Sequence, residues 1–309
     1  MSAGARSGVL PVEKGPGVTS FQVVAHVRRL LRAPKVGHGG TLDPEATGVL
    51  PLLVGEATKL TPYLIDLDKE YVATVQLGVV TDTQDASGTV LETRPVPALA
   101  AADVEAALAR FTGEIRQVPP MYSALHQGGR RLYEIAREGG EVPREPRTVR
   151  VDRIELLELD LPRFTIRVTC GKGTYVRTLA ADVGAALGPG ASLAALIRTR
   201  VGPMALDACV PWPELRELRR GDALWERLLP PDAPLAAVPE ARLDAAGQRA
   251  FQHGQGVDGV AGAAGLVRVR GPEGELLGIG LLRDGRLKPE RLLHPDRHAD
   301  RPGTPVLPA

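Results

Sequence analysis

The sequence contains few cysteines, few aromatic residues and almost no net charge. Its 309 residues include only Cys170 and Cys209, which are far apart and outside any CxxC pattern. This argues against a disulfide framework or a cysteine-based zinc site, and it fits a reducing cytoplasm. Residues 1–8 lack the apolar stretch of a signal peptide, and no run of about 18 apolar residues predicts a membrane span. The net charge of +1 means that any surface for a polyanion must be a local patch.

The length and the composition predict a globular protein with more than one domain. Hydrophobic residues make up 43% of the chain and charged residues 24%, which is enough for a sizeable core. A proline-rich break at residues 229–234 predicts a boundary between two units. We therefore expect a first domain at residues 1–230, a small second domain at residues 235–295, and a disordered tail at residues 296–309.

Hydrophobic periodicity predicts an α+β fold with a mixed, mostly antiparallel sheet flanked by helices. The expected helices span residues 21–31, 101–111, 130–138, 174–187 and 192–197. The expected strands span residues 69–79, 149–159, 164–170, 265–270, 276–283 and 286–293. The last three strands are joined by short glycine-containing turns and predict a small β-rich C-terminal module.

The most informative segment is G-H-G-G-T-L-D-P-E-A-T-G at residues 37–48. It contains one carboxylate, Asp43, and Pro44 biases the backbone of Asp43 away from helical conformations. Gly39, Gly40 and Gly48 permit left-handed conformations and close approach of another backbone. A loop of this composition can present Asp43 in a fixed position, although an Asp-Pro pair is also ordinary turn chemistry.

This segment and V-L-P-L-L-V-G-E-A-T-K-L at residues 49–60 resemble the signature of the TruB family of bacterial tRNA pseudouridine synthases. The resemblance covers roughly residues 12–293 and implies that Asp43 is the catalytic residue. It also implies a PUA-like C-terminal domain and isomerisation of one uridine, expected at position 55 in the TΨC loop of tRNA. This chemistry needs a uridine flipped out of its stack, but no metal, nucleotide or redox cofactor. Attack at C6, attack at C1′ and initial proton abstraction all remain open.

Two further motifs add catalytic candidates through the same resemblance. K-G-T-Y-V-R at residues 172–177 implies that Arg177 pairs with Asp43, and Tyr175 is a further expected substrate contact. K-E-Y at residues 69–71 implies that Tyr71 stacks on the target base, with help in removing a proton as a second expected role. From residue type alone, the sequence favours a core aromatic at Tyr71 and a solvated helix residue at Arg177.

The other expected substrate contacts are dispersed along the chain. His38 is expected to help hold bases apart, and Leu196 to line the uracil pocket or simply to pack in the core. Lys14 is expected to contact the RNA backbone, and Lys59 either a phosphate or another part of the protein. Other basic candidates for the RNA backbone lie near the signature segment and around residues 121–126, a segment that resembles the family's RNA-wedging insertion: Arg28, Arg29, Arg32, Lys35, Arg130, Arg131, Arg137, Arg144 and Arg147.

Two other functions are compatible with parts of the sequence. An RNA-folding chaperone could open the tRNA elbow without chemistry, and base flipping would serve both activities. A nucleotide-binding loop at residues 37–47 is disfavoured, because neither G-x-x-x-x-G-K-[ST] nor G-x-G-x-x-G is present. We expect a monomer without an obligate protein partner, since no long apolar seam predicts a dimer.

Overall fold

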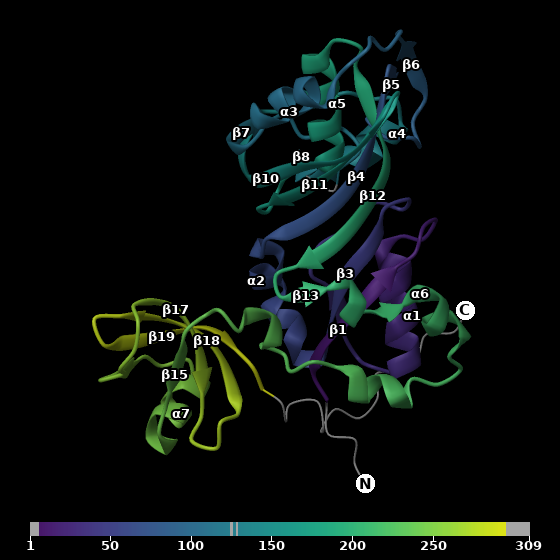
Figure 1. Cartoon of the computed structure of the whole chain (residues 1–309). Coiled ribbons are helices and arrows are strands. Elements are labelled where there is room, and N and C mark those ends of the chain that lie inside the picture. The colour runs from purple at the N-terminus through teal and green to yellow at the C-terminus, as the bar shows by residue number, and fades with distance from the viewer. Residues whose placement is uncertain (1–5, 124–125, 128, 295–309) are drawn as a thin grey trace.

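The computed structural model describes residues 6–123, 126–127 and 129–294 (Figure 1). The tail expected at residues 296–309 and two residues of the predicted RNA-wedging insertion, Ala124 and Leu125, lie outside this range. Figure 1 shows a large sheet running through the body of the molecule, with a smaller sheet to one side of its lower end. Within the described residues, no helix has both the length and the apolar character needed to cross a membrane.

Ten strands form the large sheet, and most neighbours in it are antiparallel. Its order is β14-β1-β3-β12-β4-β11-β10-β7, with β2 on β3 and β13 on β12. The pairs β1–β14 and β3–β12 are parallel. The strands are β1 (Gly8–Lys14), β2 (Val36–His38), β3 (Thr47–Val54), β4 (Lys69–Leu77), β7 (Gly113–Gln117), β10 (Arg147–Asp160), β11 (Arg163–Cys170), β12 (Ala191–Val201), β13 (Met204–Ala205) and β14 (Val210–Pro211). The predicted mixed, mostly antiparallel sheet is thus confirmed.

Strand β3 is buried on both faces, so its side chains divide between two cores. Leu50, Leu52 and Val54 join the main core, which also contains buried apolar side chains of four helices. Val49 and Leu53 point the other way, into a second core shared with the smaller sheet. This division follows from the two-residue period of a strand.

The helices are short and mostly cover the main core. They are α1 (Ser20–Leu31), α2 (Thr61–Asp66), α3 (Ala101–Ala109), α4 (Leu132–Arg137), α5 (Val176–Leu187), α6 (Trp212–Glu217) and α7 (Ala245–Gln252), with 3₁₀ turns η1 (Gly55–Leu60), η2 (Leu206–Ala208), η3 (Asp222–Arg227) and η4 (Ala233–Leu235). Two small ribbons complete the body: β5 (Val79–Thr81) with β6 (Val90–Thr93), and β8 (His126–Gln127) with β9 (Arg130–Arg131).

Helix α1 begins and ends where the sequence predicts. Thr19 is its N-cap and forms a capping box with Gln22, which satisfies free backbone amides of the first turn. Arg32 ends the helix in a left-handed conformation with a φ of 49°. The apolar face, which includes Val23, Val27 and Leu31, packs into the main core.

The helix predicted at residues 192–197 is wrong, because this segment is part of β12. Its alanines and leucines favour a helix in isolation, but tertiary context overrides this weak preference. Strand β12 lies between β4 and β3 at the centre of the sheet; it pairs with β4 along its length and with β3 at Ile197 and Arg198. This assignment matters for the site, since Leu196 and Arg198 then point to the same face of the sheet.

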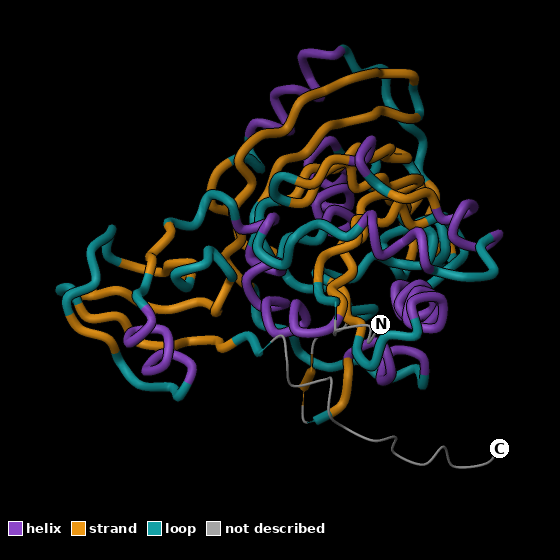
Figure 2. The backbone as a smooth tube through the Cα atoms, turned by 90° about the horizontal axis from the view of Figure 1, so that it is seen from below, coloured by secondary structure: helices purple, strands orange, loops and turns teal. Residues whose placement is uncertain are grey.

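The smaller sheet follows the proline-rich break, and Figure 2 shows it standing beside the larger one. Its order is β15-β17-β18-β19-β16. The strands are β15 (Glu240–Arg242), β16 (Val257–Asp258), β17 (Gly265–Arg270), β18 (Leu276–Arg283) and β19 (Arg286–Leu292). The predicted β-rich C-terminal module is confirmed, and its three expected strands end within one residue of the observed ones.

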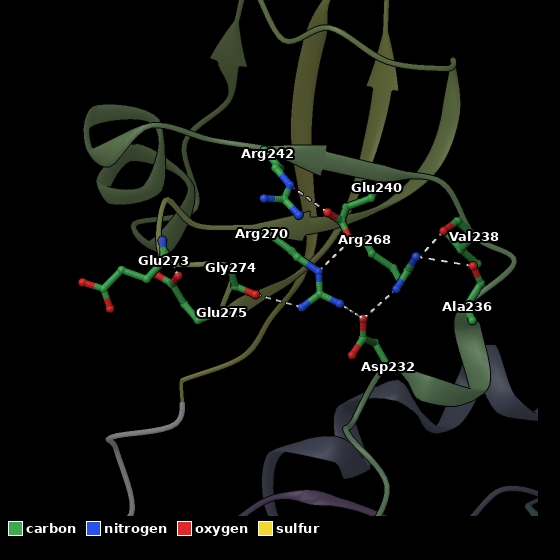
Figure 3. Close-up of polar contacts among 10 residues, drawn as sticks. All are labelled: Asp232, Ala236, Val238, Glu240, Arg242, Arg268, Arg270, Glu273, Gly274 and Glu275. Atoms are coloured by element: carbon green, nitrogen blue, oxygen red, sulfur yellow. Dashed lines mark hydrogen bonds and ion pairs between the residues drawn. The ribbon is translucent and has the colours of Figure 1, made fainter.

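Asp232 connects the chain before the smaller sheet to that sheet's own arginines (Figure 3). Its Oδ2 lies 2.9 Å from Arg268 Nη1 and 2.6 Å from Arg270 Nη2. Arg268 also donates to the carbonyls of Ala236 and Val238, and Arg270 to Glu240. Because the Asp232 side chain is only 4% exposed, this cluster fixes how the segment enters the smaller sheet.

Candidate active site

The signature segment forms a loop between β2 and β3, and buried side chains hold its backbone. Ser20 Oγ accepts a hydrogen bond from Leu42 N (2.9 Å) and donates one to Leu42 O (3.1 Å). Lys14 Nζ donates to Pro44 O at 2.7 Å. These contacts lie on either side of Asp43, so the backbone that carries this carboxylate is fixed from both directions.

Arg198 is the largest buried contributor to this loop, and sequence reasoning did not identify it. It is only 2% exposed, and it donates from Nε to Val49 O (2.7 Å) and from Nη2 to Gly40 O (3.0 Å). A longer contact runs from Nη1 to Thr41 O (3.3 Å). The expected helix at residues 192–197 concealed it, because only a strand assignment places Arg198 opposite the loop.

Lys14 does not reach the protein surface, where a contact with the RNA backbone was expected. It is completely buried, and its ammonium donates to the carbonyls of Gly15, Val18 and Pro44 at 2.7–2.8 Å. Burial lowers the pKa of Lys14 to about 8, against the opposing pull of the Glu45 and Asp43 carboxylates. The expected RNA-backbone contact is therefore corrected: Lys14 stabilises the loop from within.

Asp43 and Arg177 form the ion pair that the motifs implied. Arg177, in the first turn of α5, places Nη2 2.6 Å from Asp43 Oδ2. The side chain of Arg177 is only 7% exposed, whereas that of Asp43 remains 40% exposed and thus reachable from solvent. The buried guanidinium of Arg177 fixes the direction in which the accessible Asp43 carboxylate points.

Asp85 is the second acid on Arg177 and was not predicted. Its Oδ2 lies 3.6 Å from Arg177 Nη1. Its Oδ1 accepts from Thr83 Oγ1 (2.8 Å) and from Ser87 N (2.9 Å), which holds this carboxylate on the far side of the guanidinium. No sequence motif marked Asp85, since it lies in a polar turn of unremarkable composition.

The environment of Asp43 opposes its ionisation. Desolvation by the surrounding protein raises the pKa of Asp43, and the Asp85 carboxylate adds to the rise. The Arg177 guanidinium and Lys14 act in the opposite direction. A partly desolvated carboxylate with one strong cationic partner is suited to act as a nucleophile or a base.

Tyr71 and Leu196 share the sheet face that carries Arg198. In the β4–β12 pairing Tyr71 lies opposite Arg198, and Leu196 lies opposite Ala73. Tyr71 is only 9% exposed, and burial raises its pKa, while the adjacent Arg198 guanidinium opposes that rise. Leu196 is half-buried against the main core. Asp43 also acts electrostatically on Tyr71, so these residues belong to one neighbourhood.

Tyr175 and His38 lie at the margins of the same site. Tyr175 is the N-cap of α5, its backbone is held by Gln117, and Asp43 and Arg177 both act on its hydroxyl. His38 ends β2, and its Nδ1 accepts a hydrogen bond from Gly40 N at 3.3 Å. Burial lowers the pKa of His38, which favours the neutral ring that this acceptor role requires.

Lys59 lies at the junction with the smaller sheet. Its Nζ is 2.5 Å from Glu56 Oε2 and donates to Leu292 O at 2.9 Å, while Glu56 Oε2 also accepts from His294 N. These bonds give Lys59 a structural role between β3 and β19. A phosphate contact by the same ammonium stays a prediction.

Comparison with known proteins matches three family models to successive parts of the chain. The family model "TruB family pseudouridylate synthase (N terminal domain)" matches residues 28–176. "tRNA pseudouridylate synthase B C-terminal domain" matches residues 177–236, and "Pseudouridine synthase II TruB, C-terminal" matches residues 239–293.

Whole-chain relatives agree with these matches. A tRNA pseudouridine synthase B of Burkholderia mallei is 49% identical over 95% of this chain and 99% of its own. One from Chromohalobacter salexigens is 51% identical over 80% of each chain. Among solved structures, a chain of a Cbf5-Nop10-Gar1 complex is 26% identical with a TM-score of 0.74, covering 96% of this chain and 88% of its own. The loop geometry, the three family matches and these identities together show that the chain belongs to the TruB family of pseudouridylate synthases.

Proposed function

We propose that this enzyme isomerises one uridine of tRNA to pseudouridine, with Asp43 as the reacting carboxylate. The observation that carries this proposal is the ion pair between Asp43 and the buried Arg177, next to Tyr71. A half-exposed carboxylate, a fixed cation and a flat aromatic side chain are what a flipped uridine would meet. The names of the relatives at about 50% identity support tRNA as the substrate.

The reaction breaks the N1–C1′ bond, turns the uracil and forms a C5–C1′ bond, after which C5 loses its proton and N1 gains one. Asp43 serves as nucleophile or base in the first step, and Arg177 keeps it ionised and oriented despite the desolvation that raises its pKa. Tyr71 stacks on the extruded base, which contributes about 1–3 kcal/mol for a single base. Leu196 lines the pocket, and His38 and Tyr175 fill its margins.

We place the target uridine at position 55 of the TΨC loop, reached after base flipping. We divide the chain into a catalytic domain at residues 1–230 and a PUA-like RNA-binding domain at residues 235–295. The enzyme is proposed to act in the cytoplasm as a monomer.

The test is tritium release from C5-labelled uridine in a tRNA transcript, with wild type and Asp43→Asn in parallel. The proposal expects release by wild type only, together with the loss of one uridine at position 55 in a sequencing map of the product. Release by Asp43→Asn would contradict the role of Asp43. Tight, salt-sensitive tRNA binding without release by either protein would instead favour the chaperone function.

A further inference from the structure

The surface of α1 next to the signature loop carries an open groove of about 590 Å³. Its lining combines an exposed aromatic ring, three arginines and the start of β2: Phe21, Arg28, Arg29, Arg32 and Val36. No acidic residue contributes to the lining. The groove therefore has an apolar floor and a positive rim, which is an unusual combination on a chain whose net charge is only +1.

The arginines of this groove are free to bind a ligand. Within the described residues, none of Arg28, Arg29 and Arg32 lies within ion-pairing distance of a carboxylate, whereas some exposed arginines elsewhere, such as Arg94 and Arg130, are paired. Three unpaired guanidiniums around one groove attract a polyanion, and their planar forks match phosphate oxygens.

Phe21 is the second unusual feature. Its side chain is 76% exposed, the largest exposed fraction among the large hydrophobic residues of the described chain. It lies in the first turn of α1, on the side away from the buried Val23 and Val27. An exposed ring beside unpaired guanidiniums is the arrangement on which unpaired bases stack while the backbone is neutralised.

The elements that line the groove are connected to the loop that carries Asp43. Helix α1 packs on β2, and β2 continues directly into His38 and the loop that carries Asp43. Ser20, next to Phe21, hydrogen-bonds Leu42 inside that loop. A polyanion bound along α1 would therefore be held on the same rigid unit that positions Asp43.

We propose that this groove is an RNA-binding exosite, in which the three arginines contact the sugar-phosphate backbone and Phe21 stacks on an unpaired base. The inference rests on the proposed function for its ligand class, since the same RNA would supply the target uridine. Phosphate contacts position RNA and carry no sequence information, so the exosite raises affinity and sets register without contributing to the chemistry.

Arg32 can be replaced without disturbing the helix, because asparagine tolerates its left-handed backbone conformation. Arg32→Asn removes the guanidinium at a φ of 49° that asparagine tolerates, so α1 is expected to remain folded. The matched control is Arg110→Asn, at the exposed C-cap of α3, where the described structure contains no ion pair for Arg110 either. Dissociation constants for a tRNA transcript are measured at several salt concentrations, with thermal unfolding midpoints for both variants.

The expected result is an affinity about 3- to 10-fold weaker for Arg32→Asn, with a salt slope smaller by about 1. Arg29→Gln should act the same way, while Arg110→Asn should match wild type. Phe21→Ala should weaken binding about tenfold with an unchanged salt slope, and Phe21→Trp should restore it, since stacking needs a ring rather than charge. Equal affinities for the groove variants and the control would contradict the proposed exosite. That result would favour a protein as the ligand of the groove.

A second comparison identifies which RNA segment occupies the groove. If the variants lose the same affinity for an isolated TΨC stem-loop as for full-length tRNA, the groove binds the stem-loop itself. If they lose affinity only for full-length tRNA, the groove binds a segment outside the stem-loop. Failure of the proposed function is recognised separately, as absence of tritium release by wild type. The exosite is measured by binding alone and can be judged in either case.

Discussion

Gly48 and Arg198 face each other across the parallel pairing of β3 and β12, and their backbones nearly touch. A Cβ atom on Gly48 would lie 2.2 Å from the carbonyl oxygen of Arg198. Gly48 also has a φ of 103°, a conformation that residues with side chains rarely adopt. The glycine at the end of the signature segment thus allows Arg198 to reach the loop carbonyls that fix Asp43.

The substitution Gly48→Ala should therefore destabilise the fold strongly. The new methyl group must move the backbone of β12 and adopt a strained φ, for which we expect a loss of about 3 kcal/mol or more in the free energy of unfolding. The control is Gly17→Ala, whose φ is 70° but whose added Cβ would meet no atom within 4 Å. Urea unfolding of both variants separates steric overlap from backbone strain, since Gly17→Ala should cost only about 1 kcal/mol. Equal losses would show that strain alone explains the glycine.

Arg198→Met should impair the loop more than any surface arginine could. It keeps a long apolar side chain but leaves the carbonyls of Gly40 and Val49 without their donor, at an expected cost of about 3 kcal/mol. Activity should fall with stability, because the displaced loop carries Asp43. Arg200→Met is the matched control on the same strand: Arg200 is 38% exposed, and its contact with Glu70 is 3.7 Å. That variant should lose less than about 1 kcal/mol in the same unfolding experiment.

Asp85→Asn should lower the rate of isomerisation without weakening tRNA binding. It retains the hydrogen bonds to Thr83 and Ser87 in part but removes one of the two charges that orient Arg177. A misaligned Arg177 holds Asp43 less well in the transition state, so we expect kcat to fall on the order of tenfold, about 1.4 kcal/mol, with KM nearly unchanged. Asp82→Asn, in the same turn, is the control, because Asp82 Oδ1 caps Thr89 N and is not paired with Arg177 among the described residues. A change in KM alone would contradict this role.

The sequence predicted the ion pair between Asp43 and Arg177 better than the residues that support it, for a physical reason. Asp43 and Arg177 lie in contiguous motifs whose composition is distinctive over several residues, so local sequence is enough to single them out. Asp85 and Arg198 act through contacts between segments about 90 and 150 residues apart in the chain, respectively. The sequence predicts an RNA contact for Lys14 because it is one of the basic residues that flank the signature segment, and only the packed structure reveals the three carbonyls that accept its hydrogen bonds. Helix α1 was predictable because its caps and apolar face are local, whereas β12 depended on neighbours distant in sequence.

The raised pKa of Asp43 makes stability depend on pH in a defined direction. The folded pKa lies above the ordinary value of 3.8, so between these two values the native state binds more protons than the unfolded state. The free energy of unfolding therefore decreases as the pH rises through the folded pKa of Asp43, because the favoured protonated form is lost. Asp43→Asn, which has no charge to desolvate, should be more stable than wild type at neutral pH, and the difference should shrink as pH falls below that pKa. Thermal unfolding of both proteins from pH 3.5 to about 7 measures this, and a difference that grows on acidification would contradict it.

Asp232 provides a test of how the smaller sheet is held. Its carboxylate is 4% exposed and shared by Arg268 and Arg270, whose side chains are 14% and 21% exposed. Asp232→Asn keeps the shape but leaves two mostly buried guanidiniums with a weaker acceptor, so we expect a loss of about 2–3 kcal/mol after allowing for their partial exposure. Asp258→Asn is the control in the same sheet, since Asp258 is 75% exposed and 3.6 Å from Arg286, and it should cost less than about 0.5 kcal/mol.

Hydrogen exchange of the β17 amides measures the loss of stability within the smaller sheet. Protection there should fall in Asp232→Asn while the amides of β4, in the large sheet, remain protected, because the second core that joins the two sheets is untouched by this change. A uniform loss of protection in both sheets would mean that they unfold as one unit, and that Asp232 stabilises the whole chain rather than the seating of the smaller sheet.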